Sequence, residues 1–157
     1  MMKWLFLLTL ILLTACQQKT NSDSQVRDLL PQNQYAMLIV ESESCIYCKQ
    51  LRKDLQNQSL AGELQGMDVY SILYESNARV RYILNGQERI STEEELAKLL
   101  KVSSFPQIFF YDREGRVLLH LPGYQPPKTL ACSIRYVRGG EYKKGGYMDY
   151  MKAQECL

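Results

Sequence analysis

The sequence predicts an α/β domain in which helices flank a central mixed sheet. Short runs of apolar and β-branched residues alternate along the chain with segments that carry apolar side chains at helical spacing. Two of the later apolar runs are separated by only a few turn-forming residues, which indicates an antiparallel hairpin beside strands that are joined by helices. The predicted order is strand, helix, strand, helix, hairpin, helix.

The first strand and helix are predicted between residues 35 and 58. Tyr35–Val40 is an apolar run followed by polar residues, which is typical of a buried strand that ends at the surface. The segment 45–58 contains neither Gly nor Pro, and Ser44 is a suitable N-cap for a helix that begins there. Its apolar side chains recur at helical spacing: Cys48, Leu51 and Leu55.

The later elements follow from composition and turn signals. Strand composition is found in four segments: Met67–Tyr74, Arg79–Leu84, Gln107–Tyr111 and Val117–Leu121. The turn Asn85-Gly86 ends the segment Arg79–Leu84. The turn Asp112–Gly115 joins Gln107–Tyr111 and Val117–Leu121 into a hairpin. A helix is expected after Ser91, which forms a capping box with Glu94, and another from Pro127 to Gly139.

Cys45 and Cys48 lie three residues apart at the predicted start of the first helix. Free backbone N–H groups and the helix dipole favour a thiolate there, so Cys45 is the candidate nucleophile. Cys48 shares the apolar face of Leu51 and Leu55, and is expected to be buried and suited to resolving a mixed disulfide. The pair predicts thiol-disulfide chemistry that needs no cofactor beyond its own disulfide.

A metal site and an inert structural disulfide are the alternative interpretations of this pair. A zinc site needs four ligands, and the chain offers no second close Cys or His pair, so no metal site is expected. His120 is the only histidine, and its apolar strand-like surroundings favour a structural role. An inert structural disulfide is the other alternative, which the polar approach to Cys45 disfavours.

Residues 1–15 resemble a bacterial lipoprotein signal peptide. Lys3 provides a basic start, and Trp4–Leu13 is an apolar run too short for an ordinary membrane-spanning helix. The motif Leu13-Thr-Ala-Cys16 resembles the site at which such peptides are cut and the cysteine is acylated. The resemblance implies that Cys16 is the lipidated first residue of the mature protein, anchored to a membrane. A plain secretory signal that leaves Cys16 as a thiol is the alternative.

The position and composition of the remaining chain predict its organisation. The resemblance to a lipoprotein signal also implies a place: Gln17, rather than Asp, follows the cysteine, which in such proteins favours the outer over the inner membrane of a bacterial cell envelope, with the domain facing the periplasm. Residues 16–34 are expected to be a polar tether with a brief helix near Val26–Leu30, and residues 35–157 a single domain. The net charge of +2 falls when Lys3 leaves with the signal, and without a basic stripe no nucleic-acid partner is expected.

Three motifs resemble the thioredoxin fold across the mature domain. The first is the CxxC at a helix start. The second is Val102–Pro106 before a strand, which resembles the loop that ends in a cis-proline. The third is Gly115 in the hairpin turn with Leu121–Tyr124 after it, which resembles the closing strand and its following glycine. The CxxC context and Glu95-Leu-Ala are similar to periplasmic SoxW-like thioredoxins.

This resemblance implies a role for each site residue. Cys45 attacks a substrate disulfide, and Cys48 releases the reduced substrate. Pro106, in the cis form, lies against the pair, while Phe105 offers its backbone to the substrate chain. Tyr47 is included as a substrate-binding residue. A simple strand-entry proline is the alternative for Pro106.

The partners implied are periplasmic proteins with thiols or disulfides and a membrane protein that donates electrons. Periplasmic disulfide isomerases, which share a Tyr before the second Cys, add a dimerisation domain for which this chain has no room. A monomeric reductase is therefore expected. The alternatives are an isomerase or oxidase, or a non-enzymatic lipoprotein that binds a partner protein or a soft metal such as Cu(I).

The sequence also departs from the family pattern. Many thioredoxins carry a buried Asp where this chain has Ile39. Glu41 and Glu43 could replace it, but both are expected to be solvated loop charges. Ile46-Tyr47 replaces the usual Gly-Pro between the cysteines, so the reduction potential does not follow from the resemblance.

Cys132 and Cys156 form the second candidate pair. Cys132 falls on the opposite side of its predicted helix from the apolar stripe, and the C-terminal segment that ends near Cys156 could fold back against it. We expect a structural disulfide between them in an oxidising compartment, with two free thiols as the alternative.

Overall fold

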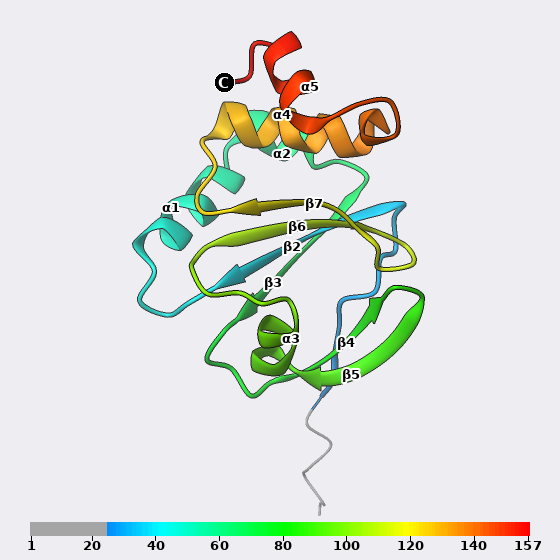
Figure 1. The fold of residues 1–157 in the computed structure, drawn as a ribbon. Coiled ribbons are helices and arrows are strands. Elements are labelled where there is room, and N and C mark those ends of the chain that lie inside the picture. Colours follow the sequence, from blue (N-terminus) through cyan, green and yellow to red (C-terminus); the bar gives the residue numbers. More distant parts are fainter. Residues whose placement is uncertain (1–24) are drawn as a thin grey trace, which may run out of the picture.

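The computed structural model describes residues 25–157, in which a four-stranded mixed sheet forms the centre (Figure 1). The sheet order is β3-β2-β6-β7, where β2 is parallel to β3, and β6 is antiparallel to both β2 and β7. The strands are β2 (Tyr35–Glu41), β3 (Met67–Leu73), β6 (Gln107–Asp112) and β7 (Val117–Pro122). Every residue of β2 and β6 is buried, because these two strands have neighbours on both edges and packed side chains on both faces.

Helices cover both faces of this sheet, which confirms the expected central mixed sheet flanked by helices (Figure 1). On one face are α1 (Ile46–Leu55), α2 (Gln58–Glu63) and α4 (Pro127–Arg138), and on the other is α3 (Glu93–Leu99). Alternate residues of β2 enter separate cores: Met37 and Ile39 pack with Leu51 of α1, whereas Leu38 and Val40 pack with Leu96 of α3.

A second, three-stranded sheet extends the α3 face. It has the order β1-β4-β5, with β1 (Arg27–Asp28), β4 (Arg79–Leu84) and β5 (Gln87–Thr92). The β4–β5 hairpin turns at Asn85-Gly86, both of which have positive φ. The turn before β7 closes against this hairpin: Gly115 also has positive φ, and an added Cβ would lie 2.1 Å from the Ile83 carbonyl oxygen, so only glycine fits.

The segment before β2 differs from the expected tether. Residues 27 and 28 pair in parallel with β4, and Leu29 is buried in the core, so the expected helix near residues 26–30 is wrong. The Arg27 guanidinium binds the buried Glu93 carboxylate and the Ser71 carbonyl oxygen. The folded part therefore begins upstream of the expected boundary at residue 35. Residues 1–15 and Cys16 lie outside the described residues.

Two helix starts are shifted by one residue from the predicted ones. Cys45 itself, rather than Ser44, is the N-cap of α1. Thr92 rather than Ser91 is the N-cap of α3 and forms the capping box with Glu95, because β5 continues through Thr92. Both shifts follow from where the neighbouring backbone ends, which a local sequence pattern does not specify.

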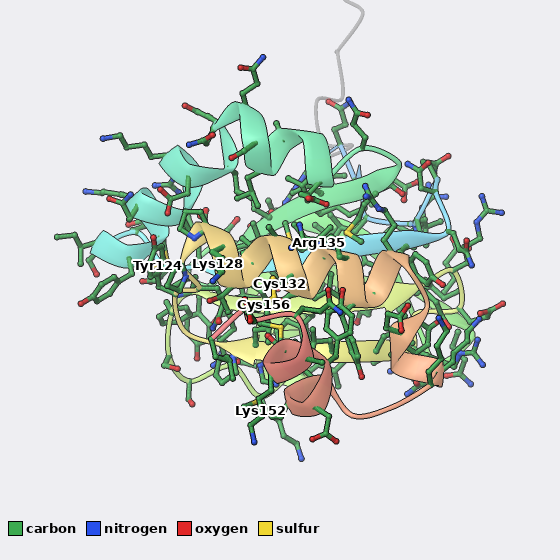
Figure 2. The ribbon with its side chains drawn as sticks, turned by 90° about the horizontal axis from the view of Figure 1, so that it is seen from above. Tyr124, Lys128, Cys132, Arg135, Lys152 and Cys156 are labelled. Atoms are coloured by element: carbon green, nitrogen blue, oxygen red, sulfur yellow. A yellow bond between two sulfur atoms is a disulfide. The ribbon has the colours of Figure 1, made fainter. Side chains whose placement is uncertain are left out.

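The chain ends in a short extension that packs on the outer side of α4. A 3-10 turn (Glu141–Lys143) leads to α5 (Tyr147–Ala153), whose Met151 is fully buried. A disulfide joins Cys132 of α4 to Cys156, with their Cα atoms 6.2 Å apart (Figure 2). The Thr129 hydroxyl donates to the Cys156 carbonyl oxygen at 3.2 Å, which reinforces the same connection.

Within residues 25–157, the structure has no helix of the length and apolar character needed to cross a membrane.

We expect the Cys132–Cys156 disulfide to stabilise the domain. Replacing both cysteines by serine should lower the free energy of unfolding by about 3 kcal/mol, because the bridge closes a loop across a separation of 24 residues. Urea denaturation of the oxidised proteins measures this change. As a control, replacing both Cys45 and Cys48 should cost less, since that disulfide has a separation of only 3. Equal losses in the two double variants would contradict the prediction.

Candidate active site

The Cys45–Cys48 pair lies where the chain leaves β2 and enters α1. β2 ends at Glu41, three residues form a turn in which the Cys45 N–H donates to the Ser42 carbonyl oxygen, and α1 follows. The two cysteines form a disulfide with their Cα atoms 5.2 Å apart. Cys45 is partly exposed, whereas Cys48 is completely buried. Of the two cysteines, only Cys45 is accessible from outside.

The backbone around Cys45 favours negative charge on its sulfur. Cys45 has an extended conformation (φ −83°, ψ 106°) as the N-cap of α1, and its Sγ accepts a hydrogen bond from the Cys48 backbone N–H at 3.0 Å. When the disulfide is reduced, the same N–H and the positive end of the helix dipole would stabilise a thiolate. The sulfur itself takes the place of the oxygen that usually caps a helix.

Pro106 lies at the same end of the sheet as the cysteines. The Phe105–Pro106 peptide bond is cis. Gln107, the next residue, pairs with Val40 near the end of β2, which places Pro106 beside the segment that leads to Cys45. Pro106 is buried, and its carbonyl oxygen accepts from the Gly123 N–H at 2.8 Å. The Phe105 ring packs edge-on against Tyr74, 5.2 Å between centroids.

An aromatic pair lies beside the CxxC. Tyr47 is 60% exposed, and the centroid of its ring is 6.0 Å from that of Tyr124. The Tyr124 hydroxyl donates to the Asp54 carboxylate of α1 at 2.6 Å, and this hydrogen bond raises the pKa of Tyr124. Sequence reasoning missed Tyr124 as a site residue. The sequence shows Tyr124 only as part of the family's motif after the hairpin, and no local pattern indicates its partner.

Glu41 differs from its expected role as a solvated loop charge. Its side chain is only 6% exposed, and Oε2 accepts from the Arg52 guanidinium at 2.8 Å. Oε1 is buried and has no hydrogen-bond partner among the described residues. By strand alternation Glu41 points to the same face as Ile39, where α1 packs, and Arg52 lies one helical turn after Cys48. A buried carboxylate therefore lies under the reactive helix.

The turn before Cys45 is held by a second carboxylate. Glu75 follows β3, and it accepts hydrogen bonds from the Ser42 hydroxyl and, at 3.3 Å, from the Glu43 N–H. These contacts lower the pKa of Glu75, the Ser42 hydrogen bond being the largest cause. Glu43 itself is exposed, as expected.

His120 has a structural setting. Its ring stacks on Phe109 with centroids 4.2 Å apart, and its Nε2 is 2.7 Å from the Gln107 Oε1. Partial burial of the ring lowers the pKa of His120, because desolvation disfavours the charged imidazole. Within residues 25–157 no three His, Cys, Asp or Glu side chains gather as a metal site would require.

The structure brings Cys45, Cys48 and Tyr47 together, with Phe105 and Pro106 at the same end of the sheet. It places Cys132 and Cys156 elsewhere, on the outer side of α4 (Figure 2). Both cysteines are buried, at 1% and 2% exposed, and they pack in one cluster with Met151 of α5. They are therefore not part of the CxxC site.

Known proteins support this description. The model of the thioredoxin-like domain family matches residues 22–138. A thioredoxin-fold protein from Helicobacter pylori superposes with a TM-score of 0.72 at 22% identity, over 81% of this chain and 83% of that one. A thioredoxin from Thermus thermophilus gives 0.51 at 20% identity, over 71% and 86%. Both show the same fold. No curated protein sequence matches the chain.

The fold and the CxxC disulfide together support thiol-disulfide oxidoreductase activity. The match covers β1 to α4, and α5 with Cys156 follows it. The chain belongs to the thioredoxin-like domain family.

Proposed function

We propose that the chain is a membrane-tethered thiol-disulfide oxidoreductase of the bacterial cell envelope, which reduces disulfides of periplasmic proteins. The observation that carries the activity is the asymmetry of the pair: Cys45 is partly exposed at a helix N-cap, and Cys48 is buried one turn further on. An attacking thiolate needs access and stabilisation, whereas a resolving thiol needs only to reach its neighbour.

The reaction proceeds by two exchanges. The Cys45 thiolate attacks one sulfur of the substrate disulfide, so a bond between Cys45 and the substrate forms, and the other substrate sulfur leaves as a thiolate that takes a proton from water. Cys48 then loses its proton and attacks the Cys45 sulfur. The Cys45–Cys48 disulfide forms and the second substrate thiol is released. The substrate gains two electrons and the protein loses them, and a membrane electron donor restores the dithiol.

Glu41 is the group suited to accept the Cys48 proton. Ile39 cannot take a proton, whereas Glu41 points to the same face of β2 and is buried. Its Oε1 has a free acceptor site in the described structure, while Arg52 holds the other oxygen. A carboxylate with one uncommitted oxygen beneath α1 can serve as a base.

Three observations support the location. The residues Leu13 to Cys16 match a lipoprotein signal, which would anchor the domain through Cys16. The buried Cys132–Cys156 disulfide suits an oxidising compartment such as the periplasm. Gln17 is the residue after the lipidated cysteine, and the absence of Asp at this position favours the outer membrane.

The proposed activity predicts distinct defects for the two cysteines. Cys45→Ser should abolish insulin reduction, because no nucleophile reaches the substrate disulfide. Cys48→Ser should accumulate a mixed disulfide between Cys45 and the substrate, because nothing resolves it. Turbidity measures the first effect and non-reducing mass spectrometry the second. Cys132→Ser, which leaves the CxxC intact, is the control for both. Turnover that persists without Cys45 would exclude this function, and the reduction potential of the pair would separate a reductase from an oxidase or isomerase.

The proposed anchor predicts where the protein fractionates. Wild-type protein made in a bacterial host should be found with the membranes, and Cys16→Ser should move it to the soluble fraction, since the acyl chains are lost. Cys156→Ser should remain with the membranes. An N-terminal peptide without an acyl mass in the wild-type protein would contradict lipidation.

The proposed base predicts an altered pH dependence. Glu41→Gln should slow resolution of the mixed disulfide by about 100-fold at pH 7, because Cys48 must then lose its proton to solvent. The deficit should shrink as the pH rises, since hydroxide replaces the missing base. Stopped-flow measurement of mixed-disulfide decay provides the profile, with the exposed Glu43→Gln as control. A Glu41→Gln profile parallel to that of the wild type would rule this role out.

A further inference from the structure

The two sulfurs of the Cys132–Cys156 disulfide have different polar neighbours. The Arg135 Nη2 donates a hydrogen bond to the Cys132 Sγ at 3.1 Å. Figure 2 shows both residues on α4, where they are three positions apart and share one side of the helix. The Cys156 Sγ instead lies 3.4 Å from the Gln154 carbonyl oxygen. A positive charge therefore faces one sulfur, and a partial negative charge faces the other.

This difference determines which sulfur leaves more readily when a thiol attacks the bridge. In thiol-disulfide exchange, one sulfur accepts the attacking thiolate and the other leaves with the bonding electron pair as a thiolate. A thiolate on Cys132 would be stabilised by the Arg135 guanidinium, because hydrogen bonds between charged groups are strong. A thiolate on Cys156 would be repelled by the Gln154 carbonyl oxygen. Attack at Cys156, with Cys132 as the leaving group, is therefore favoured.

The positions of the two cysteines in the chain favour the same direction. Cys132 lies in the middle of α4, is 1% exposed and packs with Met151. Cys156 is 2% exposed, but it follows the end of α5, and only the exposed Leu157 comes after it. Its N–H donates to the Met151 carbonyl oxygen at 2.9 Å, and its carbonyl oxygen accepts from the Thr129 hydroxyl. Chain ends open at the lowest cost, so Cys156 can be uncovered without displacing α4.

The residue before Cys156 also favours opening of the chain end. Glu155 has a φ of 53°, in the left-handed region that residues other than glycine rarely adopt. Such a conformation costs energy and persists where surrounding contacts hold it. Opening the bridge removes one of the contacts that hold the chain end, and the backbone of Glu155 can then relax.

We propose that the Cys132–Cys156 bridge is a second exchange site, at which a small thiol modifies Cys156 and Cys132 leaves as a thiolate bound to Arg135. The small thiol loses its proton to water, and its thiolate attacks the Cys156 sulfur. A mixed disulfide between the small thiol and Cys156 forms as the Cys132–Cys156 bond breaks. The small thiol is oxidised and Cys132 is reduced, so the number of disulfides is unchanged and no other oxidant is needed.

The geometry of the bridge selects a small thiol as the reactant. Both cysteines are buried, and the movement that uncovers Cys156 involves the few residues after α5. The helix α5 itself stays attached through the fully buried Met151. An opening of this size admits a thiol of the dimensions of glutathione, whereas a folded protein needs a larger exposed surface around the disulfide that it attacks.

The test exposes the oxidised full-length protein to glutathione under native conditions and maps the adducts. Acid stops the exchange after short times, and pepsin, which is active in acid, yields the peptides for mass spectrometry. We expect about ten times as much glutathione on Cys156 as on Cys132, at the lower end of what a hydrogen bond to a charged group provides. The accessible Cys45 provides the positive control for exchange.

Variants of Arg135 assign this preference to its charge. Arg135→Gln should slow the modification of Cys156 about tenfold and bring the adduct ratio to about one, because the Cys132 thiolate loses its charged partner. Arg135→Lys should keep part of the preference, since the positive charge remains. Arg138→Gln is the matched control: Arg138 lies on the same helix and also pairs with Glu63, so its loss should leave the rate and the ratio unchanged.

A purely structural role for Arg135 predicts the opposite change in rate. If Arg135 only connected α4 to Glu63 of α2, Arg135→Gln would loosen this region and speed the exchange. Faster exchange with the tenfold ratio retained would therefore overturn the role of Arg135. Equal adducts on Cys132 and Cys156 in the wild type, or glutathione on Cys45 alone, would overturn the exchange site without any variant. These results do not depend on whether the CxxC reduces protein substrates.

Discussion

The pairing of β2 with β3 and β6 is the constraint on which the active site depends. β2 is hydrogen-bonded on both edges and buried at every residue, so its end is fixed relative to the whole sheet. The turn that follows places Cys45 as the first cap of α1, while the register of Val40 with Gln107 brings the cis Pro106 to the same end. Backbone hydrogen bonds thus set the position of the reactive sulfur before any side chain is considered.

Side chains from separate elements surround the start of α1 and make the contacts that differ most from the sequence-based expectations. Arg52 satisfies one oxygen of the buried Glu41, and the other oxygen remains open in the described structure. Tyr124, from the opposite side, supports the exposed ring of Tyr47. The Glu41–Arg52 pair and the Tyr47–Tyr124 pair therefore lie on different sides of α1. This separation allows one to be changed by mutation without removing the other.

Most elements could be predicted from the sequence because their signals are local. The apolar run of β2, the hairpin turn at Gly115 and the proline at the start of α4 each act within a few residues. Errors arose where distant backbone decides the outcome. Residues 27 and 28 form a strand because they pair with the free edge of β4. Strand β5 extends to Thr92 because Thr92 pairs with Arg79 of β4. The secondary-structure propensity of a segment does not specify which distant strand it will pair with.

In the site, too, some features follow from local sequence patterns and others depend on distant residues. The sequence alone determined the CxxC pair near a helix start and the proline before β6, since each is a short pattern with its own physical cause. Only the tertiary structure decided that Glu41 is buried rather than solvated, and that Tyr124 meets Tyr47, because both depend on how α1 packs against β2 and against the segment before α4. Burial and contact between residues far apart in the chain are properties of packing, and no local pattern encodes them.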